Sequence, residues 1–363
     1  MREAPEIAIV GSGLAALATY ATLRHGGVGA EGIVVFGADA DPTAAWRRRA
    51  GSIRQRRMRS ESDGHLAAAA WPGLALRERR LAPLWQTLAN RYHPPVDLFL
   101  RHAEEVRARS GWERSFVERR VAHIAAAGDG FEVDGDGVFR HVLVATGHPG
   151  HALPDTLVDD PRVVHAYEPH EYASHVTVVG AGMAAATEWL NALEAGAEVV
   201  SVRRREPTRQ PLTVPRPLLS KRGLAGFHGL SHERRAALLR ELSTPSYPPG
   251  PAWDEPLTRA EAEGRFRVEA ALNGAEQIIC ATGFLRGYRN DPLLARLVAE
   301  HGLETHDRWI VLAPDSTVPG LTDDDRTLAV AGVAAQWAFP AADTIAGAKY
   351  AARAFLRRLC RTR

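Results

Sequence analysis

Two stretches of the chain show the same succession of apolar and polar positions. Residues 7–10 form a short apolar run, which is followed by a glycine-containing turn and an Ala/Leu-rich stretch to Leu23. Residues 176–193 repeat this succession, and a further apolar run comes after each copy, at residues 33–36 and 198–202. Strand, glycine turn, helix and strand make a βαβ unit. The pattern therefore predicts two such units, each part of a doubly wound parallel sheet.

A third apolar run completes each copy and ends in Ala-Thr-Gly, at residues 142–147 and 278–283. The repeated order predicts an α/β fold with two Rossmann-like dinucleotide-binding domains, the second inserted into the first. We expect the first domain to comprise residues 1–170 and 286–363, and the second to comprise residues 171–285.

Two regions depart from this regular order. Residues 207–256 are rich in Pro, Arg and Leu, and we interpret them as an insert in the second domain with a helix at 233–242. Residues 344–358 have their apolar positions at helical spacing. The chain is therefore predicted to close with a helix.

Each glycine turn fits the pattern G-x-G-x-x-A between a strand and a helix. The first glycine makes the tight turn, and the second lets a pyrophosphate approach the backbone. The start of the helix then offers unpaired N–H groups and a positive dipole end to phosphates. One such match is also seen in ordinary glycine turns, but two in this context predict two bound nucleotides. The predicted contacts are Gly11, Ser12, Gly13, Leu14 and Ala15 in the first turn and Gly180, Gly182, Met183 and Ala184 in the second.

The end of the second strand of each unit indicates which nucleotide binds, because an acid there binds ribose hydroxyls and a cation binds a 2′-phosphate. In the second unit this position is occupied by Arg203, and Arg204 and Arg205 follow it. A guanidinium matches a phosphate with two hydrogen bonds, so the run predicts NADPH. The alternative is a solvated basic run in an Arg-rich protein.

The first unit lacks the expected acid. Gly37 stands at that position, and Asp39 and Asp41 follow in the loop. Either carboxylate could reach a ribose from there, and we take Asp39 as the candidate. This position is the weakest part of the first predicted site.

Composition narrows the class of protein. The 363 residues carry a net charge of +2, with 45% hydrophobic and 24% charged residues, which is typical of a globular protein without a nucleic-acid partner. Cys280 and Cys360 form no C-x-x-C pair, which argues against a disulfide framework, a zinc site and a redox dithiol. No apolar run is long enough to cross a membrane, and the first strand follows the N-terminus closely. We expect a cytoplasmic protein.

The order of the glycine turns and Ala-Thr-Gly segments resembles that of flavoproteins with two dinucleotide-binding domains. Within them it is similar to the class B flavin-dependent monooxygenases, which include flavin-containing monooxygenases, Baeyer–Villiger monooxygenases and amine N-hydroxylases. The resemblance covers nearly the whole chain. Residues 43–47 resemble the family's G-G-x-W segment with both glycines replaced, and residues 281–284 resemble its A-T-G-[YF] segment. Residues 331–333 and 339–342 resemble the return to its FAD domain.

The resemblance implies FAD in the first domain and NADPH in the second. It places Arg59 and Ser60 near the flavin ring, as catalytic polar groups. It implies further cofactor contacts at Trp46, Arg47, Val121, Ala145, Thr146, Gly147, Thr282, Gly283, Gly332, Phe339, Pro340 and Ala341.

The implied activity is that of an NADPH-dependent FAD monooxygenase, which inserts one oxygen atom of O2 into an amine or a sulfide through a C4a-(hydro)peroxyflavin. Of the family's F-x-G-x-x-x-H motif only His165 is present, which makes a Baeyer–Villiger enzyme less expected. One alternative is an NADPH-dependent flavoprotein reductase that passes electrons to a small-molecule or protein acceptor without a dithiol. Another is a flavoprotein that binds nucleotides without turnover. The expected partners are a small-molecule substrate and O2, with neither nucleic acid nor membrane, and a homo-oligomer remains open.

Overall fold

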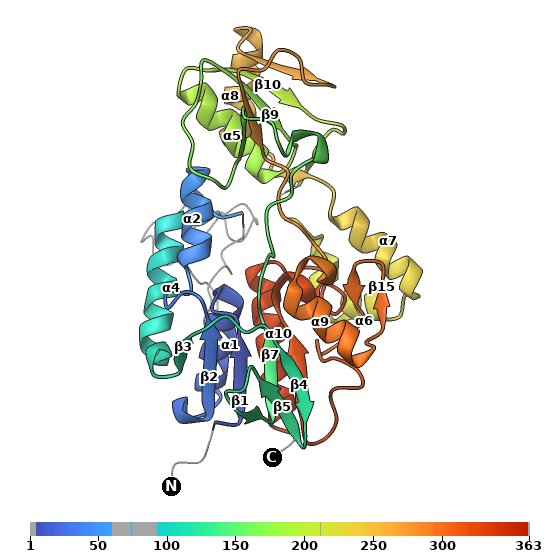
Figure 1. Ribbon diagram of the computed structural model, residues 1–363. Coiled ribbons are helices and arrows are strands. Elements are labelled where there is room, and N and C mark those ends of the chain that lie inside the picture. The colour runs from blue at the N-terminus through green and yellow to red at the C-terminus, as the bar shows by residue number, and fades with distance from the viewer. Residues whose placement is uncertain (1–4, 60–73, 75–92, 211, 362–363) are drawn as a thin grey trace.

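The structure is a computed structural model that describes residues 5–59, 74, 93–210 and 212–361. It contains two parallel sheets, one above the other in Figure 1, and each has its own helices. In this part of the chain no helix combines the length and the apolar character needed to cross a membrane.

The first sheet has five parallel strands in the order β17-β7-β1-β2-β3. Their bounds are β1 (Ile7–Val10), β2 (Ile33–Gly37), β3 (Phe116–Glu118), β7 (His141–Val144) and β17 (Thr327–Val330). Alternate residues of the central strands serve opposite faces. Ile9 and Leu143 pack under the helices, while Val10 and Val144 pack toward the antiparallel strands on the other face. Burial on both faces explains why these strands are continuous apolar runs in the sequence.

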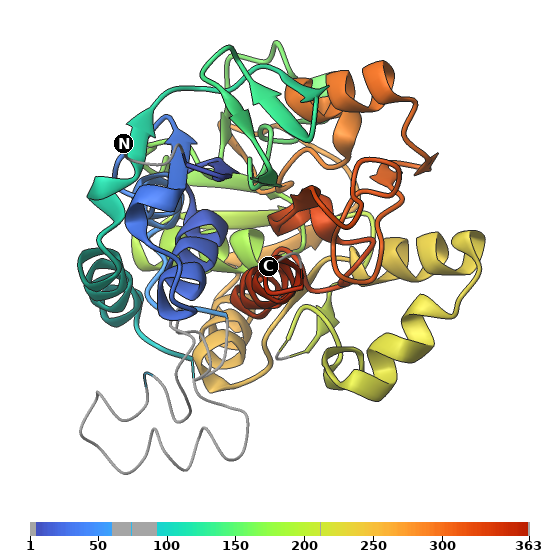
Figure 2. The ribbon, with the colours of Figure 1, turned by 90° about the horizontal axis from the view of Figure 1, so that it is seen from below.

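The helices on one face of this sheet and the small antiparallel sheet on the other are seen in Figure 2. The elements are α1 (Leu14–His25), α2 (Ala44–Ser52), α4 (Val96–Ser110), α10 (Ile345–Leu359), β4 (Ile124–Ala127), β5 (Gly130–Val133) and β6 (Val138–Phe139). The predicted closing helix is confirmed as α10, which Thr344 caps by accepting a hydrogen bond from Gly347 N.

The second sheet is also parallel, in the order β13-β10-β9-β14-β8, with α5 and α8 packed on it. Its elements are β8 (Val163–His165), β9 (His175–Val179), α5 (Met183–Glu194), β10 (Glu198–Val202), α8 (Pro251–Ala262), β13 (Phe266–Glu269) and β14 (Gln277–Cys280). Strand β8 precedes residue 171, the predicted start of the second domain, yet pairs with β14. The α/β class and the two doubly wound sheets are as the sequence predicts.

Two chain segments join the sheets, one between β7 and β8 and one after β14 (Figure 1). They touch as an antiparallel bridge between His151 and Phe284, with Leu285 N donating to Gly150 O over 2.9 Å. Beyond this crossing lie α9 (Pro292–His301), β15 (Thr305–His306) and β16 (Trp309–Ile310). The short 3-10 helices are η1 (Ala30–Gly32), η3 (Trp112–Arg114), η4 (Asp155–Leu157), η5 (Arg216–Leu219), η6 (Tyr288–Asn290) and η7 (Gly332–Ala335).

The middle of the predicted insert leaves the second sheet, whereas its end enters α8, which packs on that sheet. The insert contains β11 (Thr208–Arg209), α6 (Lys221–His228), α7 (His232–Leu242) and β12 (Ser246–Tyr247), and α7 lies beside β15 (Figure 1). Phe227 of α6 and Leu239 of α7 are buried in the same cluster as Trp337 of the first unit. The Arg235 guanidinium lies over both the Phe227 and Trp337 rings, at 5.2 and 5.0 Å. The insert therefore ties the second unit to the core of the first.

Candidate functional site

The two glycine turns have the same construction. Gly11 has φ +116°, and a Cβ on it would lie 2.2 Å from the Ala145 carbonyl oxygen. Gly180 has φ +139°, and a Cβ on it would lie 2.5 Å from the Ala281 carbonyl oxygen. In each unit the alanine of Ala-Thr-Gly thus packs directly beneath the first glycine of the turn. Only glycine fits these two places, because both the backbone angle and the contact exclude a side chain.

The second glycine of each turn faces open space. A Cβ on Gly13 or on Gly182 would meet no atom within 4 Å. Neither residue caps its helix with a side chain, so the first N–H groups of α1 and α5 are left for another partner. A helix start of this kind binds phosphate. The predicted contacts Leu14, Ala15, Met183 and Ala184 lie in the first turns of these two helices.

Ser12 explains why Gly37 replaces the expected acid. A Cβ on Gly37 would lie 2.2 Å from both Cβ and Oγ of Ser12 and 2.9 Å from its nitrogen. The Ser12 hydroxyl therefore occupies the space beside the strand end, where it accepts a hydrogen bond from Asp39 N at 3.3 Å. The Asp39 carboxylate pairs with Arg48 at the surface. Asp41 instead accepts hydrogen bonds from the backbone and side chain of Thr43, at the start of α2.

The predicted contacts around α2 anchor that helix. Trp46 packs edge-on against Phe99 of α4, with ring centroids 5.3 Å apart. Arg47 donates to the hydroxyl of Thr43 at 3.0 Å and pairs with Asp41. Both side chains therefore fix α2 against the first unit.

Of the remaining predicted contacts of the first unit, Thr146 and Gly147 follow β7, Gly332 follows β17, and Val121 lies between β3 and β4. Thr146 donates to the buried Asp291, Gly147 has φ +80°, and Val121 is half-buried. Gly332 has φ +71°, and a Cβ on it would lie 3.9 Å from the Cβ of Ala15 in α1. Phe339, Pro340 and Ala341 are buried in the turn that leads to α10. The structure thus gathers β1, β7, β17 and the start of α10 at one edge of the sheet.

Asp343 lies directly before α10 and carries a buried oxygen, Oδ1, without a hydrogen-bond partner among the described residues. Its other oxygen lies 3.6 Å from Nη2 of Arg286, which follows β14. Burial lowers the pKa of the Arg59 guanidinium to about 10, and the negative charge of Asp343 opposes that shift.

Arg59 connects the two units. Its Nη1 donates to Ser246 O at 2.9 Å, and its Nη2 donates to the Ser246 hydroxyl at 2.8 Å and to Gln210 O at 3.3 Å. These partners lie on and beside β11 and β12 of the insert. The predicted catalytic role of Arg59 stays a prediction, and Ser60 lies outside the described residues.

The three arginines after β10 differ from one another. The Arg203 side chain is 13% exposed, lies over the Trp189 ring at 5.7 Å and pairs with Glu206. Arg204 and Arg205 are exposed. Arg209, which the sequence did not single out, lies over the Tyr247 ring at 4.2 Å and pairs with Asp254. Two further cations are thus held on aromatic rings near the exposed pair.

At the exit of the second sheet, Thr282 donates to Ala152 O, and Gly283 O lies 3.1 Å from the His165 Nε2. Both predicted residues therefore contact the segment that joins β7 to β8.

An aromatic cluster that the sequence did not predict fills the crossing of the two joining segments. We call it the junction cluster. His148 stacks on Phe284 at 4.2 Å, Tyr167 stacks on the same ring at 4.6 Å, and His151 stacks on His165 at 4.2 Å. Arg49 of α2 lies over Phe284 at 4.7 Å. Of these rings only His165, Tyr167 and Phe284 belong to segments that sequence motifs had marked.

The junction cluster predicts a loss of stability in acid. Burial lowers the pKa of His148 to about 3, and the positive charges of Arg286 and Arg49 add to this shift. Burial also lowers the pKa of His165 to about 4, and the neighbouring His151 adds to that shift. The unfolded chain, with histidine pKa values near 6.5, therefore takes up protons that the folded chain refuses. Stability is complete above about pH 6.5 and falls as the pH drops toward the folded pKa values of His165, about 4, and His148, about 3.

Thermal unfolding at about pH 7 and about pH 4.5 measures this effect. His148→Gln should reduce the drop in Tm between the two pH values. The control is His25→Gln, because His25 is exposed at the end of α1. An equal drop in wild type and in His148→Gln contradicts the assignment to His148.

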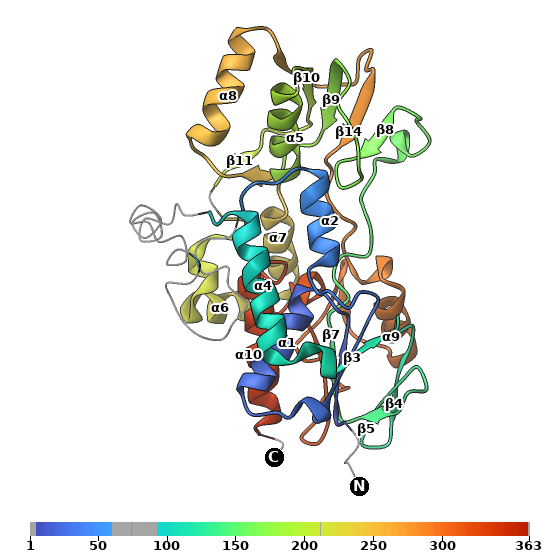
Figure 3. The ribbon, with the colours of Figure 1, turned by 90° about the vertical axis from the view of Figure 1, so that its left-hand side faces the viewer.

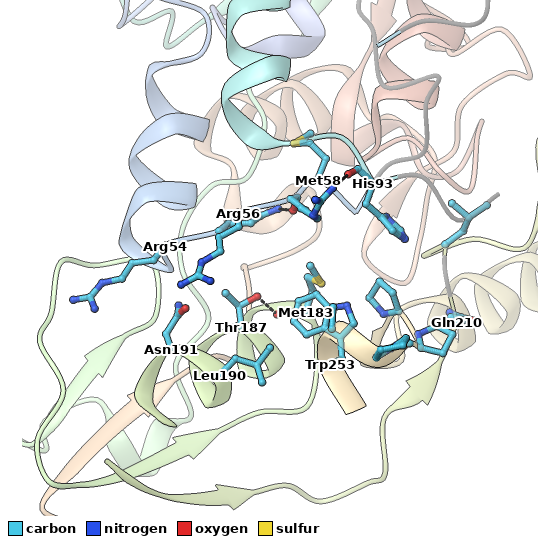
Figure 4. Close-up of a pocket in the computed structure, with 18 of the residues that line it drawn as sticks. Arg54, Arg56, Met58, His93, Met183, Thr187, Leu190, Asn191, Gln210 and Trp253 are labelled. Atoms are coloured by element: carbon cyan, nitrogen blue, oxygen red, sulfur yellow. Dashed lines mark hydrogen bonds between the residues drawn. The ribbon is translucent and has the colours of Figure 1, made fainter. Parts of the chain in front are cut away.

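A cavity of about 1240 Å³ lies between the two units (Figure 4). Its walls are residues 54–58 after α2, His93, one side of α5, the segment 248–253, and the insert residues Gln210, Leu212, Pro215 and Arg216. Met183, the first residue of α5 after the second glycine turn, lines it. Figure 3 shows α2 rising beneath α5, where Asn191 donates to Ile53 O at 2.7 Å. The second predicted nucleotide site therefore opens into this interdomain cavity.

No family model and no curated protein matches the sequence, but solved structures match the fold. An ornithine N-hydroxylase from Kutzneria sp. 744, solved with reduced FAD, NADP+ and L-ornithine, aligns over 98% of this chain and 100% of that one, with 15% identity and a TM-score of 0.74. DfoA from Erwinia amylovora, a cadaverine monooxygenase bound to FAD, aligns over 98% and 94%, with 13% identity and a TM-score of 0.75. The chain has the fold of these flavin-dependent monooxygenases.

This flavoprotein fold is shared with reductases. The bacillithiol disulfide reductase Bdr from Bacillus cereus aligns over 98% of this chain and 100% of its own, with 14% identity and a TM-score of 0.61. Fold similarity therefore shows the two-domain fold alone, and the cofactors and the reaction have to be argued from the residues of the site.

Proposed function

We propose that the chain is an NADPH-dependent FAD monooxygenase that transfers one oxygen atom of O2 to a small nucleophile, an amine nitrogen or a sulfide. The observation that carries this proposal is the pair of matching glycine turns, each closed beneath by an alanine carbonyl and open above its second glycine. The second turn faces a large interdomain cavity. Two nucleotides held in this way support electron transfer between them.

The first site fits FAD. The free N–H groups at the start of α1 suit the pyrophosphate, and Ser12 and Asp39 lie at the strand end where a ribose is expected. The start of α10, with the unpartnered Asp343 oxygen beside it, faces the region assigned to the ring. Bound FAD would supply hydride acceptance and oxygen activation, while the chain positions it and excludes water.

The insert favours oxygenation over a reductase reaction. Domains joined by small polar interfaces move relative to one another, whereas a large apolar interface holds them. Here α6 and α7 bury Phe227 and Leu239 in the core of the first unit, and Arg59 ties β12 to the segment after α2. A fixed second unit keeps the walls of the cavity in place during turnover, which suits a reaction that must limit the access of water.

The test of the function is the fate of O2 in the FAD-loaded protein supplied with NADPH and a panel of sulfides and amines. We expect at least one compound to be oxygenated with little hydrogen peroxide relative to NADPH consumed. Peroxide equal to NADPH with every compound, together with rapid reduction of an artificial electron acceptor, identifies a reductase. A protein that takes up no FAD contradicts both readings.

The exposed arginines predict coenzyme preference. Replacing both Arg204 and Arg205 with Ser removes two exposed guanidiniums from the end of β10. We expect the KM for NADPH to rise about 10- to 100-fold, since each contact of this kind is charge-assisted. The KM for NADH should stay nearly constant.

Steady-state flavin reduction with each coenzyme measures this difference. Arg109→Ser on α4 is the control, because Arg109 is an exposed arginine far along the chain from the β10 end. Equal KM changes for both coenzymes would assign the 2′-phosphate to other residues, with Arg203 and Arg209 the next to test.

The cytoplasmic location also stays part of this proposal. Cys280 is buried and Cys360 exposed, and both are free thiols, as in a reducing compartment.

A further inference from the structure

The interdomain cavity has an uneven charge. Four arginines line it: Arg54, Arg56, Arg57 and Arg216. Glu194 is the one acid among the described residues of its wall, and it is already paired with Arg56. Arg54 pairs with Glu171, which lies outside the wall. The wall therefore presents a surplus of positive charge.

Arg57 carries the least compensated of these charges. Its hydrogen-bond partner among the described residues is the His93 carbonyl oxygen, to which Nη1 donates at 3.0 Å. A carbonyl satisfies a hydrogen bond but supplies no negative charge. The side chain is exposed and lines the cavity, where it can attract an anion over several ångströms.

Most of the remaining wall surface is apolar, although Gln55, His93, Thr187, Asn191 and Gln210 also line it. Met58, Leu190 and Trp253 lie on three different sides of the cavity, and prolines of the segment 248–251 complete it. Figure 4 shows Trp253 and Met183 side by side below the Arg56–Met58 segment. Such a wall suits an apolar body, with the arginines fixing one charged end.

The length of α5 separates the Arg56 end of the cavity from the glycine turn. The glycine turn lies at Met183, and Glu194, where Arg56 is bound, is 11 residues further, or about 16 Å along the helix axis at 1.5 Å per residue. The cavity volume of about 1240 Å³ also exceeds the range of about 300–1000 Å³ usual for one ligand. There is room for a second ligand beyond the nucleotide.

We infer that the substrate of this chain is an anionic molecule, with a carboxylate or similar group and an apolar body, whose charge is met by Arg57 and its neighbouring arginines. This inference rests on the proposed monooxygenase function. A diamine, such as the cadaverine on which one structural neighbour acts, would meet four guanidiniums and no uncommitted carboxylate among the described wall residues.

The test uses three sulfides that differ only in charge: para-(methylthio)benzoate, thioanisole and para-(methylthio)benzylamine. Their dissociation constants are measured on the FAD-loaded protein from the change in the flavin spectrum, with NADP+ present at saturation so that the nucleotide site is filled. We expect the benzoate to bind about tenfold more tightly than the benzylamine, and the difference to shrink between about 0.05 and 0.5 M salt. Equal binding, or tighter binding of the benzylamine, overturns the inference.

Variants then locate the charge. Arg57→Gln should weaken the benzoate and leave thioanisole unchanged, and Arg57→Glu should reverse the order of the two charged sulfides. Arg109→Gln, on α4, makes the same charge change outside the cavity and should alter nothing. If Arg57→Gln weakens NADP+ but not the benzoate, the arginines serve the nucleotide and the inference fails. These measurements need no turnover. A protein that prefers the benzoate but oxygenates no compound would therefore contradict the proposed monooxygenase function and not the inference about the anionic substrate.

Discussion

Gly37→Glu, which restores the acid expected at the end of β2, should abolish FAD binding. A Cβ at this position would lie 2.2 Å from the Ser12 Cβ and Oγ and 2.9 Å from the Ser12 nitrogen. Ser12 lies between the two glycines of the turn that is proposed to receive the pyrophosphate. A side chain at position 37 therefore pushes that turn out of place, and we expect FAD affinity to fall at least about 100-fold.

Flavin content after purification and quenching of flavin fluorescence on the apoprotein measure the affinity. The double variant Ser12→Gly with Gly37→Glu removes the side-chain contacts and leaves the 2.9 Å contact with the backbone nitrogen. It should regain part of the lost affinity. Gly51→Glu is the matched control, since a Cβ on Gly51 meets nothing within 4 Å. If the single variant Gly37→Glu bound FAD more tightly than the wild type, Ser12 would not be the reason for the glycine at this position.

Local steric demands made the two glycine turns predictable. Only glycine can adopt φ values above +110° while a carbonyl oxygen lies where its Cβ would be. Glycines at positions 11 and 180 therefore allowed both turns to be predicted. The sequence also marked Gly37 as unusual. Its cause could not be predicted, because Ser12 and Gly37 are distant in sequence and meet only through the pairing of β1 with β2.

The packing between the two units could not be predicted from the sequence. Helical periodicity predicted a helix in the insert, and α7 confirms it, but periodicity does not say which core receives the apolar side. The sequence also did not indicate which of the three arginines after β10 is exposed. Trp189, on α5, is what holds Arg203 and leaves Arg204 and Arg205 exposed. The junction cluster depends in the same way on two segments crossing in space.

Gly182→Val should leave the fold and FAD in place and stop reduction by NADPH. Gly182 is extended, with φ −89°, and a Cβ on it meets no protein atom within 4 Å, so the protein tolerates the larger side chain. The space that valine would fill is where a pyrophosphate is expected to approach the start of α5. We expect the rate of flavin reduction by NADPH to drop at least about 1000-fold, since misplacement at the reacting centre is added to lost binding.

Stopped-flow flavin reduction measures this rate, and dithionite reduction with the flavin absorbance spectrum verifies that FAD is bound. Gly13→Val should give the reciprocal result, a folded protein without FAD, because Gly13 also faces open space. Gly226→Val, at an equally open position on α6, is the control that should change neither property. Normal reduction of Gly182→Val by NADPH would remove the second glycine turn from the nucleotide site. Loss of FAD in Gly182→Val with retention in Gly13→Val would instead mean that the two nucleotides are assigned to the wrong units.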